Sequence, residues 1–127
     1  MDIWTGYYAQ MKKYVQADLV PVSIAYLTPV WYMGETCFEL APSRKLLTGY
    51  KAGKVTQEEY AEQYKDFLKT VKWGEVIEKL FSISDRHDGK DLVLCCYEKP
   101  SDFCHRHLLA EYLTENGMDV QEWVVKK

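Results

Sequence analysis

The stretch LVLCCYEKPSDFCHRHLLAEYL, residues 92–113, decides the fold of this chain. Its first part, residues 92–97, is a continuous apolar run without polar alternation, which is typical of a strand buried on both faces of a parallel sheet. After a polar EKP turn, Ser101 or Asp102 is expected to cap a helix over 102–116 that ends at an Asn-Gly pair. The stretch therefore predicts the central strand of a sheet and the helix that follows it.

The flanking segments predict further strands and helices around this centre. Apolar runs bounded by turn residues indicate short strands at 3–5, 22–26 and 120–125. Helical spacing indicates a short helix after Ser43, a helix from a Thr56 capping box to about residue 71, and a shorter helix around 76–81. Residues 7–18 allow only a loop or a short helix, and residues 29–43 predict an irregular aromatic loop.

This order of elements predicts one fold class and one domain. Strand, helix and strand at the C-terminus, preceded by helical segments, favour a three-layer α/β fold with a mostly parallel sheet and helices on both faces. A chain of 127 residues has the length of a single compact domain, so residues 1–127 are expected to form one domain.

Composition limits the classes of function. The formal net charge of −3 gives no overall positive field for nucleic acid, although a local basic patch remains open. No apolar run is long enough to cross a bilayer, and the start of the chain has no signal-peptide pattern, so a cytoplasmic location without membrane contact is expected. In such a reducing compartment the four cysteines are expected to be free thiols rather than disulfides.

The turn between the predicted central strand and its helix gathers residues that carry chemistry. Ligands of open α/β sheets bind outside the carboxyl ends of the strands, where the next helix presents its free amides and its positive dipole end. Cys104 is expected in the first helical turn beside His105 and Arg106, and thiols in such surroundings ionise easily. The sequence thus points to a thiol site or an anion site at this turn.

Each residue at this turn has a candidate role. Cys104 is the candidate nucleophile or redox thiol, His105 its proton partner, and Glu98 a general base or ligand contact. Arg106, with amides near Ser101, is the candidate anion contact. Each role has a purely structural alternative. Cys104 could simply pack against the sheet, and Glu98 and Arg106 could be solvated charges on the surface.

The two cysteines of the strand differ from each other. Cys95 and Cys96 point to opposite faces, and Cys95 is expected to fill the core. Cys96 lies nearer the strand end and is a candidate ligand contact.

A metal centre is not predicted. Zinc sites usually take four ligands, and no C-x-x-C pair is present. A set could still be assembled from Cys96, Cys104, one of the two nearby histidines, and Cys37 or Glu98.

A second cluster is basic. Arg44, Lys45, Lys51 and Lys54 place positive charge next to Tyr50. Together with the aromatic loop 29–43, this cluster supports an alternative in which the protein is a non-enzymatic module that binds nucleic acid or a protein partner.

The string LCCYEKPSDFCHRHLLAEYL resembles the domain of unknown function 488 family, which carries a C-x-E element at a strand end and a C-H-R element at a helix start. Cys96 and Glu98 match the first element, and Cys104, His105 and Arg106 match the second. Leu109, Ala110, Glu111 and Leu113 fit the helix that follows.

The resemblance extends over nearly the whole chain. IWTGYY, through Gly6 and Tyr7, is similar to the opening strand and turn of the family, which makes Tyr7 a candidate ligand contact. LAPSRKLLTGYKAGKVTQEEYAEQY resembles one branch of the family. Many members carry an Asp and an Arg on the second strand where this chain has residues 22–25, VSIA, so Arg44 or Lys45 is the candidate replacement for that charge.

The resemblance implies an α/β fold and a shared polar site but no reaction. The leading hypothesis is an anion-binding, nucleotide-binding or thiol-based catalytic site at the junction of strand and helix, with a phosphate-bearing small molecule or nucleic acid as the partner. Whether the protein is an enzyme, which cofactor it uses and how it oligomerises stay open at this point.

Overall fold

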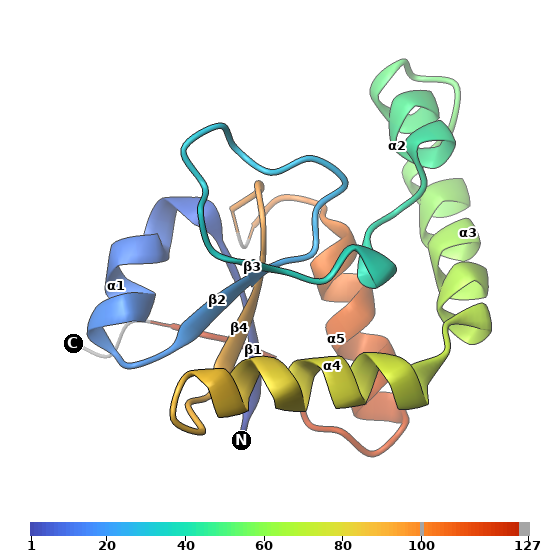
Figure 1. Cartoon of the computed structure of the whole chain (residues 1–127). Helices are drawn as coiled ribbons and strands as arrows, with labels where there is room; N and C mark the ends of the chain where they lie inside the picture. Colours follow the sequence, from blue (N-terminus) through green and yellow to red (C-terminus); the bar gives the residue numbers. More distant parts are fainter. Residues whose placement is uncertain (100, 125–127) are drawn as a thin grey trace.

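The computed structural model describes residues 1–99 and 101–124, which form a three-layer α/β fold (Figure 1). Its middle layer is a five-stranded, all-parallel sheet in the order β3-β2-β4-β1-β5. The strands are β1 (Ile3–Tyr7), β2 (Val20–Ser23), β3 (Glu35–Thr36), β4 (Leu92–Cys96) and β5 (Gln121–Glu122).

Helices cover both faces of the sheet. They are α1 (Met11–Gln16), α2 (Arg44–Lys51), α3 (Gln57–Thr70), α4 (Trp73–Arg86) and α5 (His105–Glu115). Figure 1 shows α1 on the opposite side of the sheet from α4 and α5. Tyr14 of α1 belongs to one core cluster, whereas residues of α3, α4 and α5 belong to the other. The predicted fold class is therefore confirmed. Among the described residues, no helix combines the length and the apolarity that a membrane crossing requires.

Strand β4 is the centre of the sheet, as its sequence predicts. All five of its residues are buried, and it pairs in parallel with β1 on one side and with β2 on the other. The register places Tyr7 opposite Cys96 and Ser23 opposite Cys95. The carboxyl ends of the three strands therefore meet at one edge of the sheet, and α5 begins there.

The predicted starts of the two helices in the middle of the chain, α2 and α3, are confirmed. Thr56 and Glu59 form the predicted capping box at the start of α3, and the Ser43 hydroxyl accepts the Leu46 amide at the start of α2. Helix α4 is as long as α3 and not shorter, because it begins at Trp73. The Trp73 indole donates to the Leu68 carbonyl of α3, which fixes the corner between the two helices.

The start of α5 was predicted wrongly. Its N-cap is Cys104 rather than Ser101 or Asp102, and its first helical residue is His105. The Asp102 amide donates to the Lys99 carbonyl, so Ser101 and Asp102 belong to a turn that precedes the helix. Ser and Asp favour turns as well as caps, which explains why the sequence signal was ambiguous.

Other boundaries also differ from the prediction. The loop 29–43 was predicted to be irregular but contains β3 and a 3₁₀ helix, Phe38–Leu40. Residues 7–18 contain a 3₁₀ helix, Tyr8–Gln10, followed by α1, which agrees with the short helix that the sequence allowed there. Strand β2 ends at Ser23, and the chain leaves the sheet after one further hydrogen bond, which the Ile24 amide donates to the Cys95 carbonyl. The last strand was expected over 120–125. The structure gives Gln121–Glu122, and Val125 lies outside the described residues.

Gly6 and Gly74 test the packing of β1. A Cβ atom on Gly6 would lie 2.9 Å from Val93 Cγ2 and would also overlap the Tyr14 hydroxyl, whereas a Cβ atom on Gly74 in α4 would meet nothing within 4 Å. We expect Gly6→Ala to lower the free energy of unfolding by about 1–3 kcal/mol. Gly74→Ala, the matched control, should be neutral or stabilising by up to about 1 kcal/mol. Urea unfolding followed by circular dichroism measures both, and equal stabilities of the two variants would contradict this packing.

Candidate functional site

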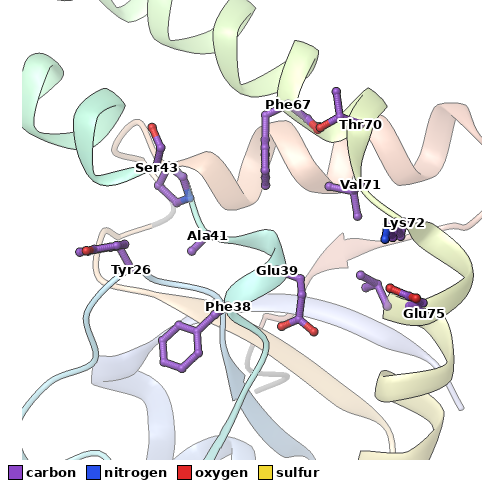
Figure 2. Close-up of a pocket in the computed structure, with 12 residues that line it drawn as sticks. Tyr26, Phe38, Glu39, Ala41, Ser43, Phe67, Thr70, Val71, Lys72 and Glu75 are labelled. Carbon is purple, nitrogen blue, oxygen red and sulfur yellow. The ribbon is translucent and has the colours of Figure 1, made fainter.

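Two neighbouring cavities open near the carboxyl edge of the sheet, and both include Tyr26 and Pro42 in their walls. The first has a volume of about 530 Å³ and lies between the 3₁₀ helix Phe38–Leu40 and helices α3 and α4 (Figure 2). Phe38, Phe67 and Val71 give it apolar walls, and its charged residues are Glu39, Lys72 and Glu75. No cysteine or histidine lines this cavity, so it holds none of the predicted site residues.

The second cavity holds the motif. It has a volume of about 450 Å³, which is within the usual range for small-molecule sites. Four of the predicted site residues line it: Cys96, Glu98, Cys104 and His105. Tyr50, Tyr60 and Phe103, whose ring centroids lie 5.2–5.4 Å apart, form an aromatic wall, and Lys51 contributes a cationic group. The motif therefore faces a space that fits a small ligand.

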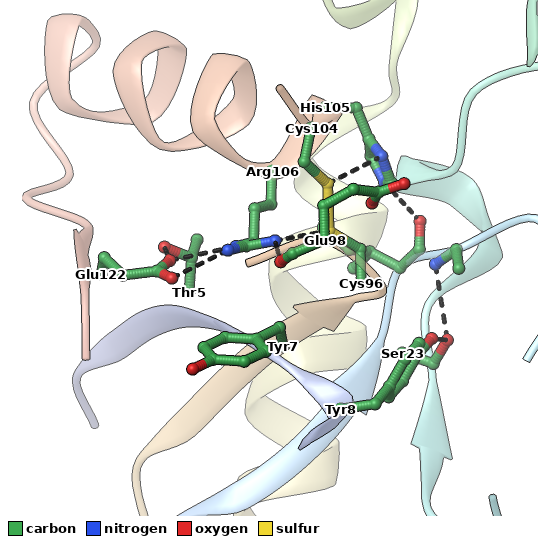
Figure 3. The surroundings of a disulfide bond; sticks show 12 residues. Thr5, Tyr7, Tyr8, Ser23, Cys96, Glu98, Cys104, His105, Arg106 and Glu122 are labelled. Atoms are coloured by element: carbon green, nitrogen blue, oxygen red, sulfur yellow. Dashed lines mark hydrogen bonds and ion pairs between the residues drawn. A yellow bond between two sulfur atoms is a disulfide. The ribbon is translucent and has the colours of Figure 1, made fainter. Parts of the chain in front are cut away.

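Cys96 and Cys104 are joined by a disulfide, shown in Figure 3. The expectation of free thiols was wrong for this pair. The bond joins the last residue of β4, Cys96, to the N-cap of α5, Cys104. Cys37 and Cys95 are free and buried, as expected. Burial raises the pKa of Cys37 to about 11 and that of Cys95 to about 12, so both remain protonated near neutral pH.

His105 is held in one orientation beside Cys104. Its Nε2 lies 2.8 Å from the Ile24 carbonyl, which can only accept a hydrogen bond, so Nε2 carries the proton. Nδ1 is then a bare acceptor 3.7 Å from Cys104 Sγ (Figure 3). Burial lowers the pKa of His105 to about 4, with the positive charge of Arg106 adding to the effect, so the ring is neutral near pH 7. Nδ1 is therefore free to accept a proton or a metal ion.

Arg106 lies beneath the sulfur pair and is completely buried. Its guanidinium binds both carboxylate oxygens of Glu122 at 3.1 and 2.9 Å, and it also donates to the Glu98 carbonyl at 2.6 Å and to Cys96 Sγ at 2.9 Å. The Tyr7 ring lies 5.7 Å from the guanidinium carbon. Arg106 is not among the residues that line the cavity, so it acts on Cys96 from behind.

Glu122 is the functional residue that the sequence prediction missed. Burial alone would raise the pKa of its carboxyl group, but hydrogen bonds from Arg106 and Thr5 outweigh this effect and hold the pKa below its usual value. Thr5 Oγ1 donates to the carboxylate at 2.7 Å. One feature of the sequence could have identified Glu122. An acidic residue inside a predicted strand needs a cationic partner, because an unpaired charge is costly there.

The remaining predicted residues lie at different distances from the thiols. Tyr7 ends β1 beside Arg106, whereas Ser101 is exposed in the turn before α5 and does not line the cavity. Arg44 is exposed and, with Lys45, lines a separate cavity between α2, the segment that follows it and α3. Neither brings charge to the second strand.

The second strand carries a buried polar pair instead of charges. Ser23 Oγ lies 2.6 Å from the Tyr8 hydroxyl, and both residues are buried. Burial raises the pKa of Tyr8 to about 12, so this hydroxyl stays protonated near neutral pH.

One group of side chains among the described residues can hold a metal ion. The two sulfurs of Cys96 and Cys104 and a ring nitrogen of His105 lie within 4.8 Å of one another, and all three residues are buried. Three further candidates from the sequence, Cys37, Glu98 and His107, do not belong to this group.

Residues 20–117 match the family model DUF488-N3a, described as the active DUF488-N3 subclade. The match covers most of the chain, so the chain belongs to the DUF488 family, and the resemblance found in the sequence is confirmed. The matched range contains the sulfur pair, His105 and Arg106 but ends before Glu122. No curated protein and no solved structure matched the chain.

The Arg106–Glu122 pair can be tested by removing one or both charges. Arg106→Met leaves a buried carboxylate unpaired and should lower the free energy of unfolding by about 3–5 kcal/mol, whereas the double variant Arg106→Met/Glu122→Gln should recover most of the loss. Because the folded pKa of Glu122 is lowered, its contribution is present above the unfolded pKa and is lost as the pH falls through the folded pKa. Glu122→Gln should therefore flatten the acid side of the stability profile. Additive losses in the double variant would contradict a direct pair.

Proposed function

We propose, from the membership of the chain in the DUF488 family and the geometry of its cysteine and histidine side chains, that it is a thiol-dependent enzyme with Cys104 as the nucleophile. Its substrate is a small phosphate-bearing molecule held in the cavity of about 450 Å³. The observation that carries the proposal is the 3.7 Å approach of Cys104 Sγ to a bare His105 Nδ1. The disulfide with Cys96 is then the oxidised, resting form of the site.

His105 acts as the proton acceptor in the reduced form. Its Nε2–H bond to Ile24 prevents the ring from turning, so Nδ1 stays directed at the thiol. As Cys104 Sγ forms a bond to an electrophilic atom of the substrate, the thiol proton passes to Nδ1. Because burial lowers the pKa of His105 to about 4, the ring is neutral near pH 7, and its Nδ1 is available as the acceptor before the reaction begins.

Arg106 supplies fixed positive charge to the sulfur pair. Its Nη1 donates to Cys96 Sγ, and hydrogen bonds from a cation stabilise a thiolate. When a small thiol reductant attacks Cys104 Sγ, Cys96 can therefore leave as a thiolate, and a second molecule of the reductant then releases Cys104 from the mixed disulfide as the two reductant sulfurs become joined. The amides at the start of α5, an eleven-residue helix that Cys104 caps, add the positive end of the helix dipole.

Residues on the cavity wall contact different parts of the proposed substrate. Lys51 is the cation that faces the cavity, and we assign the phosphate to it rather than to Arg106, which is occupied by Glu122. Glu98 lines the same space and accepts a hydrogen bond from the substrate or acts as a second base. Tyr50, Tyr60 and Phe103 contact the apolar part.

Alkylation tests the nucleophile. In chain reduced with a phosphine and kept free of metal, we expect iodoacetamide to modify Cys104 well below the pH at which an ordinary thiol reacts, because the charge of Arg106 beneath the sulfur pair and the positive end of the α5 dipole favour ionisation of the thiols. Cys37 and Cys95, whose thiols are buried and have raised pKa values, are the internal control and should stay unmodified in the folded chain. Mass spectrometry of peptides after labelling at a series of pH values measures all of these sites. If Cys104 reacted only at the pH of an ordinary thiol, it would not be an activated nucleophile.

A second candidate function is partner binding through residues 29–54, and one observation favours it. Val30 and Met33 are almost completely exposed and Trp31 is largely exposed, which is unusual for three large apolar residues so close together. Arg44 and Lys45 add positive charge on exposed positions of α2. These features suit a nucleic-acid or protein partner.

Charge reversal separates the two candidates. If the protein is a binding module, Arg44→Glu/Lys45→Glu should weaken binding of a fluorescent single-stranded oligonucleotide by roughly tenfold or more, whereas Cys104→Ala should leave binding unchanged. Fluorescence anisotropy at constant salt measures both variants. Under the enzyme proposal the order is reversed, so that Cys104→Ala abolishes turnover and the charge reversal on α2 does not.

A further inference from the structure

We propose that Cys96, Cys104 and His105, when the disulfide is reduced, bind one zinc(II) ion and that this ion switches off the thiol. The inference rests on the proposed function for the activity that zinc blocks, but the metal site itself depends only on the three side chains. Their donor atoms, two sulfurs and one ring nitrogen, lie within 4.8 Å of one another, and all three residues are buried.

The orientation of His105 is that of a metal ligand. Histidines that bind metals almost always donate their other N–H to a carbonyl or carboxylate, which fixes the ring. His105 donates Nε2–H to the Ile24 carbonyl at 2.8 Å and directs Nδ1 toward Cys104 Sγ at 3.7 Å. In a tetrahedral zinc site the usual bond lengths place a sulfur and a nitrogen ligand about 3.6 Å apart. Cys104 and His105 therefore already form one edge of such a site.

The chemistry of the donors selects a soft ion. Thiolate and imidazole ligands favour zinc over magnesium or calcium, which require oxygen ligands. Binding converts two thiols and Zn²⁺ into a zinc bis-thiolate and releases two protons, without any change of oxidation state. The centre formed is neutral.

The surroundings keep this neutral centre stable when buried. Arg106 donates to Cys96 Sγ, and its own charge is balanced by Glu122, so no net charge is left beneath the metal. All three ligands line the cavity, so a water molecule from the cavity can take the fourth position of the tetrahedron without changing the charge of the centre.

Zinc and the proposed chemistry exclude each other. A metal-bound Cys104 sulfur is a poorer nucleophile than the free thiolate, and a metal-bound Nδ1 cannot accept the thiol proton. The disulfide likewise excludes zinc, because both sulfurs are then bonded to each other. The site therefore has three exclusive forms, which are the disulfide, the free dithiol and the zinc dithiolate.

Cobalt(II) and zinc(II) titrations of the full chain test the inference. The chain is reduced with a phosphine, freed of metal and titrated with cobalt(II), which should give a thiolate-to-cobalt charge-transfer band that saturates at one ion per chain and disappears on addition of zinc. Cys96→Ser, Cys104→Ser and His105→Gln should each weaken cobalt binding by at least about tenfold. Cys37→Ala and Cys95→Ala, which leave the three ligands intact, should retain the band.

A second measurement needs no variant and avoids any folding defect. Stoichiometric zinc should slow iodoacetamide labelling of Cys104 in the reduced wild-type chain by at least about tenfold, and a chelator should restore it. Absence of the cobalt band in folded, reduced chain, or labelling unchanged by zinc, would overturn the metal site. Rapid metal-free labelling without metal binding would leave the proposed nucleophile standing. Metal binding combined with labelling only at ordinary thiol pH would overturn the nucleophile and keep the metal site.

Discussion

A completely buried guanidinium organises this protein. Unpaired, such a charge would be very costly, so Arg106 must find acceptors, and it finds them in three separate parts of the chain. Glu122 comes from β5, while Cys96 and the Glu98 carbonyl come from the end of β4 and the loop after it. The first turn of α5 is thereby fixed against the carboxyl edge of the sheet. The position of Cys104 and His105, the residues on either side of the start of that helix, follows from this constraint.

The sequence was informative where one physical signal acted alone. The apolar run 92–97 predicted a strand buried on both faces, and the Thr56 capping box located the start of α3 to the residue. Both signals are local, because an apolar run and a capping box are each formed by residues that are close together in the chain. The same is true of the contrast between Cys95 and Cys96, since alternation along a strand places neighbouring side chains on opposite faces. Cys95 lies in the core with α1, and Cys96 faces the cavity.

The sequence was less informative where the answer depended on distant parts of the chain. No local pattern shows that the Ile24 carbonyl lies next to His105, yet this contact fixes the ring and makes Nδ1 an acceptor. Glu122 was missed for a similar reason, because its partner is sixteen residues away on another element. The prediction of free thiols was wrong for Cys96 and Cys104, because it rested on the expected compartment and on the spacing of the cysteines. The bond depends instead on how close the end of β4 and the start of α5 lie in the fold. The absence of a C-x-x-C pair argued against a metal, but the fold brings together the ligands that the spacing keeps apart.

The arrangement also explains why one small site can support several sulfur chemistries. Each sulfur has a different polar neighbour: Cys96 receives a hydrogen bond from a cation, and Cys104 lies beside a neutral base. Under the proposed function, Arg106 stabilises a thiolate on Cys96 and His105 accepts the proton of Cys104, so the two thiols would be chemically unequal although both are buried at one edge of the sheet. Such inequality assigns different roles to the two sulfurs in thiol–disulfide exchange, because the better leaving group is Cys96 and the proposed nucleophile is Cys104. The buried Arg106–Glu122 pair creates this difference without occupying any part of the cavity, which stays available for a ligand.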